Sequence, residues 1–291
     1  MRRAGAIRGY WQHMRLGFQL LLAPLFLWGF LLAEGRAGAA ALLAFLSLHL
    51  FLYPGATAFN SAYDRDDGPV SGLAEPPPHP PRLLPFSLAL QFAGAVLAAA
   101  VGAAFLLLYL LLALIFAAYS HPAIRLKARP LPSALAIFFG QGALGFAAGW
   151  AAATGRLPPL SDHDAQVGIY VAAWTALGLY PSTQIFQIEE DEGRGDRTLA
   201  VVLGPARALS LGATCLVFAG IGAVWLMLPQ SQLAAILVGA GFGAVVLRHM
   251  LFTGSIARRR PSRDRLYRWA TRTRLAATAG FLAFLAWRLL A

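Results

Sequence analysis

The sequence has few charged residues. Of its 291 residues, 13% are charged and 58% are hydrophobic, and that charged share is about half the share in an average soluble domain. Long apolar runs separate the few charged segments. This composition excludes an ordinary water-soluble enzyme and a disordered chain, and it indicates a membrane protein with several spans.

Cysteine and lysine are almost missing. The one cysteine, Cys215, lies in an apolar run, so an intramolecular disulfide is excluded and a cysteine-based metal site is not expected. The one lysine is Lys127, and the formal net charge of +11 comes almost entirely from arginine. In so apolar a chain, positive charge is typical of cytoplasmic loops, and we expect no nucleic-acid partner.

Nine apolar stretches are long enough to cross about 30 Å of hydrocarbon. We therefore predict an all-α polytopic membrane protein, a single domain over residues 1–291 with nine transmembrane helices. The first stretch follows three arginines and also has features of a secretory signal, which is an alternative for that segment. The predicted spans are 16–33, 39–59, 84–101, 103–119, 132–154, 166–186, 208–228, 233–252 and 275–290.

Lysine and arginine residues predict the orientation of these spans. With nine helices, 21 of the 24 basic residues fall on the side of the N-terminus. Because cytoplasmic loops carry this excess, we predict a cytoplasmic N-terminus and a C-terminus on the opposite side. The arginine-rich stretch 258–274 is expected to be a short helix lying at the bilayer interface.

Acidic residues gather in two short segments, which hold eight of the 13 in the chain. Each segment follows an apolar span, the second and the sixth, and four predicted crossings separate them. Both segments are therefore expected on the same side of the bilayer. They contain Asp64, Asp66 and Asp67, and then Glu189, Glu190, Asp191, Glu192 and Asp196.

Helical spacing groups the oxygen-bearing side chains of each segment. If the second span continues as a helix, Asn60, Asp64 and Asp67 share one face while Asp66 points away. The later segment groups three more side chains, with Glu190 at the edge of their face. Carboxylate and amide oxygens suit Mg²⁺ shared with phosphates, although solvated loop charges are the alternative. The three grouped residues are Gln184, Gln187 and Asp191.

A third polar segment follows the fourth span. It begins with Tyr119 and carries Arg125, Lys127 and Arg129 at alternate positions. These cations can hold the non-bridging oxygens of a diphosphate. They can equally be ordinary basic residues of a cytoplasmic loop, and the segment by itself favours neither interpretation.

These segments together resemble the UbiA-type intramembrane prenyltransferases, and the likeness covers nearly the whole chain. Members of that family have an Asn-Asp-x-x-Asp-x-x-x-Asp motif after helix two, a Tyr-and-Lys motif after helix four and an Asp-x-x-x-Asp motif after helix six. The positions that match are Asn60, Asp64, Tyr119, Lys127 and Asp191. Three positions depart from the motifs, namely Ser61, Gly68 and Gln187.

The resemblance implies transfer of a prenyl group from a prenyl diphosphate to an acceptor, commonly an aromatic one, in a central cleft open to the cytoplasmic side. It implies Mg²⁺ held by Asn60, Asp64, Asp67, Asp191 and Glu190, with Asp64, Asp191 and Lys127 as the catalytic residues. The expected substrate-binding residues are Arg15, Tyr119, Arg125, Tyr180, Gln184 and Gln187. Aromatic rings expected to face a developing allylic cation are Tyr63, Tyr119, Trp174, Tyr180 and Phe186.

Two other functions fit part of the pattern. A secondary transporter also has many apolar helices, but its ionisable groups usually lie near the midplane of the bilayer, whereas these acids lie at one interface. A non-catalytic lipid-binding protein descended from the prenyltransferases would explain the three departures from the motifs, because an incomplete set of ligands binds metal poorly.

Overall fold

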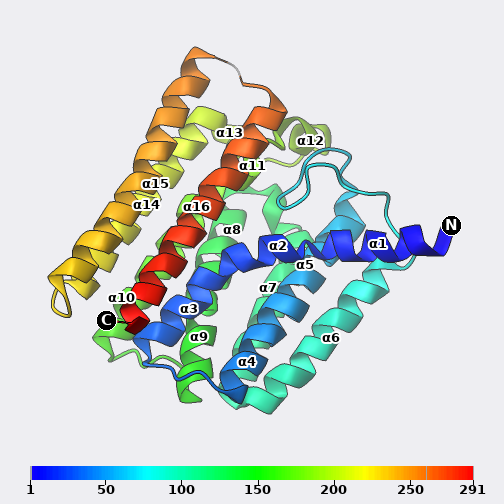
Figure 1. The fold of residues 1–291 in the computed structure, drawn as a ribbon. Coiled ribbons are helices and arrows are strands. Elements are labelled where there is room, and N and C mark those ends of the chain that lie inside the picture. Colours follow the sequence, from blue (N-terminus) through cyan, green and yellow to red (C-terminus); the bar gives the residue numbers. More distant parts are fainter. Residues whose placement is uncertain (1, 260, 291) are drawn as a thin grey trace.

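The structure is a computed structural model that describes residues 2–259 and 261–290, and this part of the chain is helical without a β-strand (Figure 1). The elements of the first half are α1 (Arg2–Met14), α2 (Leu16–Gln19), η1 (Leu20–Leu22), α3 (Ala23–Leu32), α4 (Ala39–Leu46), the π-helical η2 (Ser47–Leu52), α5 (Tyr53–Asp64), α6 (Leu83–Val101) and α7 (Ala103–Ser120).

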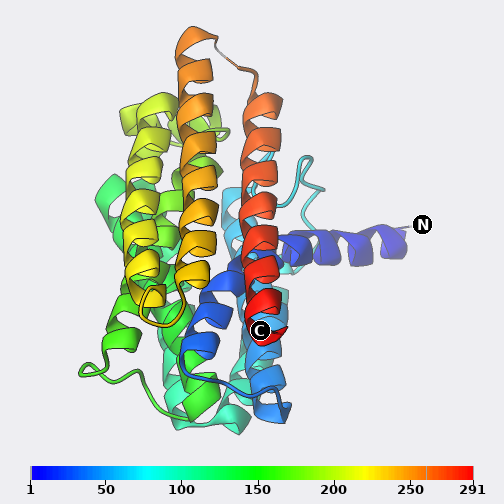
Figure 2. The same ribbon diagram turned by 60° about the vertical axis from the view of Figure 1, so that its left-hand side comes forward.

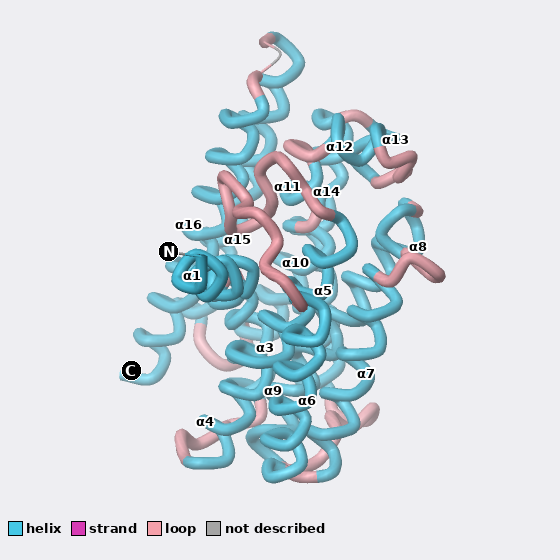
Figure 3. Tube along the Cα trace, turned by 90° about the vertical axis from the view of Figure 1, so that its right-hand side faces the viewer, coloured by secondary structure: helices cyan, strands magenta, loops and turns pink. Residues whose placement is uncertain are grey.

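The second half begins with a short 3₁₀ turn and ends with two long helices. Its elements are η3 (Leu126–Ala128), α8 (Pro130–Leu135), the π-helical η4 (Ala136–Leu144), α9 (Gly145–Thr154), α10 (His163–Leu179), α11 (Pro181–Gln184), α12 (Ile188–Gly193), α13 (Leu199–Leu203), α14 (Pro205–Met227), α15 (Gln232–Arg258) and α16 (Arg263–Leu290). The tube view shows the helices joined by loops at both ends of the bundle and by a long loop between the labels α11 and α5 (Figure 3).

Seven stretches of the described chain are long and apolar enough to cross a membrane. The other two predicted spans coincide with α10, which has 17 residues, and with α16, whose first half is rich in arginine. The count of nine spans therefore stays a prediction. The seven stretches are Ile7–Leu32, Ala39–Asp64, Leu83–Val101, Ala103–Ser120, Pro130–Thr154, Pro205–Met227 and Gln232–Arg258.

Several predicted boundaries change in the structure. The reversal expected at Gly102 is present, and this glycine has a φ of 145° that a residue with a side chain rarely adopts. The predicted span 166–186 is not one helix, because α10 ends at Leu179 and a new turn begins at Pro181. The separate interfacial helix predicted over 258–274 is wrong, since α16 runs without a break from Arg263 to Leu290.

The outer faces of the long helices are apolar. Large side chains there are more than half exposed, with Phe92 at 72% and both Trp225 and Ile236 at 66%. A soluble protein rarely leaves so many large apolar groups in contact with water. These faces are therefore suited to lipid, as the seven apolar stretches also indicate.

The first helix does not run along the bundle. Figure 1 shows α1 lying across the other helices, and the turned view shows it extending away from their side (Figure 2). Arg15, between α1 and α2, has a φ of 49° in the left-handed region, which ends the first helix before α2 begins. Arg15 is thereby set at the junction between α1 and the bundle.

Helices α3 and α9 cross in direct backbone contact. A Cβ atom on Gly29 would lie 2.0 Å from the carbonyl oxygen of Phe146, and one on Gly149 would lie 1.8 Å from that of Phe26. Such close approach is typical of glycine-mediated packing in membrane helices. Because Phe26 and Trp28 on α3 belong to the buried core on either side, this crossing fixes one wall of the helical bundle.

We predict that Gly149→Ala lowers the stability of the protein by about 1–3 kcal/mol, because the added methyl group overpacks the crossing. Thermal unfolding in detergent, followed by tryptophan fluorescence, measures the change. Gly243→Ala is the matched control, since nothing lies within 4 Å of a Cβ atom at that position. Equal melting temperatures for the two variants would contradict the close contact.

Candidate active site

The end of α5 sets the positions of its acidic residues. The helix stops at Asp64, the Arg65 amide donates to the Ser61 carbonyl at 3.1 Å, and Arg65 adopts a left-handed φ of 50°. The chain therefore turns before Asp66, whose side chain becomes 8% exposed, while Asp67 is exposed. The expectation that Asp67 faces inward and Asp66 outward is wrong, because it assumed that the helix continues.

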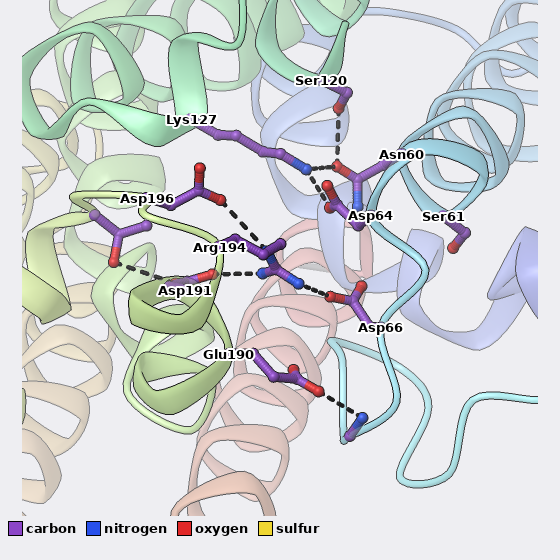
Figure 4. A network of polar contacts seen from close by, with 12 residues as sticks. Asn60, Ser61, Asp64, Asp66, Ser120, Lys127, Glu190, Asp191, Arg194 and Asp196 are labelled. Atoms are coloured by element: carbon purple, nitrogen blue, oxygen red, sulfur yellow. Dashed lines mark hydrogen bonds and ion pairs between the residues drawn. The ribbon is translucent and has the colours of Figure 1, made fainter. Parts of the chain in front are cut away.

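Lys127 reaches this helix end from the loop between α7 and α8 (Figure 4). Its ammonium donates to Asn60 Oδ1 at 2.6 Å and also to Asp64 Oδ2, and Ser120 Oγ donates to the same Asn60 oxygen at 2.9 Å. Burial lowers the pKa of Lys127, and the neighbouring Asp64 carboxylate opposes that effect. The only lysine of the chain thus lies against the motif after helix two.

Arg194 joins the two acidic segments. Its Nη1 lies 2.6 Å from Asp66 Oδ1, its Nη2 lies 2.7 Å from Asp191 Oδ1, and its Nε lies 3.5 Å from Asp196 Oδ2. Although burial alone would lower it, the pKa of Arg194 is raised by these surrounding carboxylates. In Figure 4 this guanidinium lies between the end of α5 and α12, so the expected meeting of the two acidic segments is observed.

Arg125 holds the later segment from another side. Its Nε and Nη2 donate to the two carboxylate oxygens of Asp196 at 2.9 and 2.8 Å, and Nη2 lies 3.3 Å from Asp64 Oδ1. Burial alone would raise the pKa of Asp196, but the Arg125 hydrogen bond and charge bring that pKa below its ordinary value. The Arg197 amide also donates to the Ala128 carbonyl at 2.9 Å, which fastens the two loops together.

Asp191 differs in protonation from an ordinary aspartate. It is 7% exposed, and burial raises its pKa to about 6 even though Arg194 and a hydrogen bond of 3.2 Å from Thr198 Oγ1 act in the opposite direction. A carboxylate with this pKa is sensitive to mild acidification, and such shifts are common at functional sites.

One cavity of about 560 Å³ borders this charged cluster. Its lining includes Asp64, Asp66, Lys127, Asp191 and Arg194. The rest of the lining is largely apolar and comes from η1, α3, α7, η4, α10, α14, α15 and α16, with side chains such as Leu22, Leu25, Trp28, Phe116, Ile137, Val171, Val245, Phe281 and Phe284. A charged end thus continues into an apolar interior.

The expected substrate-binding residues lie in this lining, with one exception. Tyr119 and Tyr180 share a hydrogen bond of 2.8 Å between their hydroxyls, and Gln184 Nε2 donates to the Tyr180 hydroxyl at 2.7 Å. Arg15 Nη2 donates to Ser61 Oγ at 2.7 Å. Arg15, Tyr119, Tyr180, Gln184 and Gln187 all line the cavity. Arg125 is not part of the lining and instead binds Asp196 and Asp64.

Two expected metal ligands lie elsewhere. Asp67 is exposed and outside the cavity lining. Glu190 accepts the Gly68 amide at 2.7 Å and pairs with Arg263 at 2.6 Å, so it ties α12 to the loop after α5 and to α16. A Cβ atom on Gly68 would lie 2.0 Å from Arg263 Nη2, so a side chain at this position would displace the end of the Arg263 side chain from its place.

Sequence reasoning also missed part of the lining. Of the five expected aromatic rings, Tyr63, Trp174 and Phe186 lie outside the lining and pack against other rings. The sequence contains a signal for Arg194 as a site residue, because Arg194 follows Asp191 by three residues and the two side chains share one helical face. Other lining residues had no local signal, among them Tyr53, Phe116, Arg248, Arg274 and Phe281.

The model of the UbiA prenyltransferase family matches residues 22–287, which is nearly the full length. The chain belongs to the UbiA prenyltransferase family. As a member of it with seven apolar helices, it is an integral membrane protein. A search of curated proteins finds no match.

Solved structures of UbiA homologues have the same fold. A homologue from Archaeoglobus fulgidus bound to GPP and Mg²⁺ has 21% sequence identity and a TM-score of 0.67, over 96% of this chain and 99% of the homologue. The apo homologue from Aeropyrum pernix K1 has 17% identity and a TM-score of 0.63, over 92% and 98%. A structure of digeranylgeranylglyceryl phosphate synthase has 16% identity and a TM-score of 0.63, over 97% and 98%.

The UbiA homologue's Mg²⁺ raises the question of whether these residues suit that ion. Among the described side chains, those of residues 7–259 and 261–288, no three of His, Cys, Asp or Glu are arranged as a ready metal site. The donors are nevertheless the oxygens that Mg²⁺ prefers, from Asn60, Asp64 and Asp191. Asp64 Oδ1 is buried and accepts no hydrogen bond, and its one charged neighbour is Arg125 Nη2 at 3.3 Å in the described part of the chain. The donor chemistry therefore fits a magnesium ion that also takes oxygens from a diphosphate.

The raised pKa of Asp191 predicts a pH-dependent stability for this UbiA protein. Between about pH 4 and 6 the folded protein holds a proton on Asp191 that the unfolded chain has released. The free energy of unfolding should therefore fall as pH rises through this window, by roughly 1–3 kcal/mol.

Asp191→Asn should remove that part of the pH dependence, and thermal unfolding across the window measures it. The control is Glu192→Gln, which changes an exposed neighbouring carboxylate. If Asp191→Asn keeps the slope of the unaltered protein, burial does not shift this group.

Proposed function

We propose that the protein transfers a prenyl group from a prenyl diphosphate to an acceptor inside the membrane. The observation that carries the proposal is the single cavity that joins a cluster of aspartates, Lys127 and Arg194 to an apolar interior. A prenyl diphosphate has the same division between a highly charged head and an apolar tail. The archaeal homologues bound to GPP or DMAPP with Mg²⁺ support this assignment.

The charged end has the groups needed to bind the diphosphate. Lys127 and Arg194 line the cavity and carry charged N–H donors of the kind that bind a diphosphate. Asn60, Asp64 and Asp191 would hold Mg²⁺, with Asp66 taking the place that the sequence suggested for Asp67. When bound, Mg²⁺ neutralises charge on the departing diphosphate.

Departure of the diphosphate breaks the carbon–oxygen bond, and the electron pair leaves with oxygen. Lys127 and Arg194 stabilise that negative charge where it develops. The positive charge left on the allylic carbon is attracted to aromatic faces, and Tyr119 and Tyr180 line the cavity beside the cluster. The apolar walls hold the prenyl tail and keep water from the cation.

The orientation predicted from the basic residues completes the proposal. It places the charged end at the cytoplasmic side, where a soluble diphosphate head has access from water, with the N-terminus on the same side. A transporter would need its ionisable groups near the midplane of the bilayer. In this protein the clustered carboxylates and Arg194 lie where the end of α5 meets α12, near the ends of the apolar stretches.

Binding of geranyl diphosphate tests which carboxylates act in the cavity, because Asp64, Asp66 and Asp191 line it and Asp67 does not. We expect Mg²⁺ to tighten binding to the purified protein, and Asp64→Asn, Asp66→Asn and Asp191→Asn each to reduce that gain by about tenfold or more, since each tenfold is about 1.4 kcal/mol. Asp67→Asn is the matched control, because its side chain is exposed outside the cavity. Isothermal titration with and without Mg²⁺ gives the dissociation constants, and an equal loss in Asp67→Asn would refute the assignment.

Transfer itself is tested with labelled geranyl diphosphate and a panel of acceptors in membranes that contain the protein. The expected result is a prenylated product identified by mass spectrometry, with a rate about 10²–10³-fold lower in Lys127→Gln because a charged donor to the leaving group is lost. Tight binding with no product from any acceptor would instead support a non-catalytic lipid-binding protein. Ion-gradient-driven uptake into proteoliposomes would support a transporter.

A further inference from the structure

Arg274 is a buried cation that no described residue pairs with. It lies on α16 and lines the cavity, and it is only 8% exposed. Among the side chains of residues 7–259 and 261–288 its guanidinium has no ion pair and no hydrogen bond. Its Cζ atom lies 4.6 Å from the centre of the Phe18 ring, which offers a cation–π contact but no hydrogen-bond acceptor.

Leaving a buried guanidinium without an acceptor is costly, because its five N–H donors lose their hydration. Two other arginines in the same protein avoid this cost by pairing with carboxylates. Arg125 binds both oxygens of Asp196, and Arg194 lies among three carboxylates. Arg274 lacks such a partner, so its donors remain available to a ligand in the cavity.

Arg248 on α15 adds a second cation to the same wall. Its Nε donates to Thr273 Oγ1 at 2.6 Å, and Thr273, the residue before Arg274, is fully buried and donates to the Trp269 carbonyl at 2.8 Å. This contact fixes Arg248 beside α16 without neutralising its charge. Both arginines line the cavity, so the wall formed by α15 and α16 is cationic.

The positive charge of this wall is not balanced by acidic residues of α15 and α16 near Arg248 and Arg274. Helix α15 has no acidic residue, and the one on α16 is Asp264, ten residues before Arg274 and about 15 Å away along the helix. The carboxylates of the cavity come from α5 and from the segment at α12, where Lys127, Arg125 and Arg194 bind them. The cation pair is therefore separate in its partners from the proposed diphosphate site.

We propose that Arg248 and Arg274 bind a carboxylate or phosphate group of the acceptor. This inference rests on the proposed function and assigns a role to two residues that the proposed diphosphate site does not use, namely holding the charged group of the acceptor at the α15–α16 wall. The α15–α16 wall and the charged end that holds the diphosphate belong to one cavity. An acceptor held at this wall by its acidic group therefore extends its remaining part into the apolar interior, which the prenyl tail also occupies. A guanidinium fork suits either anion through paired hydrogen bonds.

Binding of matched acids and neutral analogues to the purified protein tests this inference. The probes are para-hydroxybenzoate with para-hydroxybenzamide, and a prenylglycerol phosphate with the corresponding prenylglycerol. We expect the anion of at least one pair to bind about tenfold or more tightly than its neutral analogue, as charge-assisted hydrogen bonds require. Arg274→Gln and Arg248→Gln should remove this preference, and Arg274→Lys should retain part of it.

Arg272→Gln is the matched control, because Arg272 is an exposed arginine on the same helix and outside the cavity lining. Geranyl diphosphate binding with Mg²⁺ is measured on every variant and should stay unchanged in Arg274→Gln. This measurement also shows that the variant is folded and separates this inference from the proposed function, which fails only if the unaltered protein does not bind geranyl diphosphate.

The following results would overturn the inference. The first is equal binding of acid and neutral analogue in both pairs, or no binding of either acid by protein that binds geranyl diphosphate. The second is an equal effect of Arg272→Gln. The third is loss of geranyl diphosphate affinity in Arg274→Gln, which would assign the anion to the diphosphate. If phosphatidylglycerol in nanodiscs displaces the acid as well as added acid does, the wall binds a lipid headgroup instead.

Discussion

The charged end of the protein depends on the guanidinium of Arg194. Two segments more than a hundred residues apart in sequence each bring carboxylates to one place, and without a cation between them those buried charges would repel one another. Arg194 pairs with Asp66 from the first segment and with Asp191 from the second. This shared partner holds the loop after α5 against α12.

The sequence predicted the general fold and the location of the site for physical reasons that act locally. Apolar runs of bilayer length predict helices, and eight acids in two segments stand out in a chain with only 13. Most of the boundaries between spans followed from the same pattern, including the reversal at Gly102. The family motifs then pointed to Asn60, Asp64, Lys127 and Asp191, which the structure gathers at one cavity.

The parts that could not be predicted depend on backbone turns and on distant partners. One left-handed residue, Arg65, exchanges the directions of Asp66 and Asp67, and helical periodicity cannot foresee it. Glu190 is held by Arg263, a contact between helices far apart in the chain. Arg248 and Arg274 looked like ordinary basic residues near a membrane surface, since only the tertiary packing shows that they line the cavity.

The glycine crossing of α3 and α9 has a consequence for how the cavity adjusts to its contents. Backbone atoms in direct contact leave α3 little freedom to shift against α9, so the α3 side chains that line the cavity, such as Leu25 and Trp28, project from a fixed helix. Phe242 on α15 and Phe281 and Phe284 on α16 also line the cavity, and these side chains can change rotamer. Differences in bulk between one guest molecule and another are therefore absorbed by these aromatic side chains and not by movement of α3.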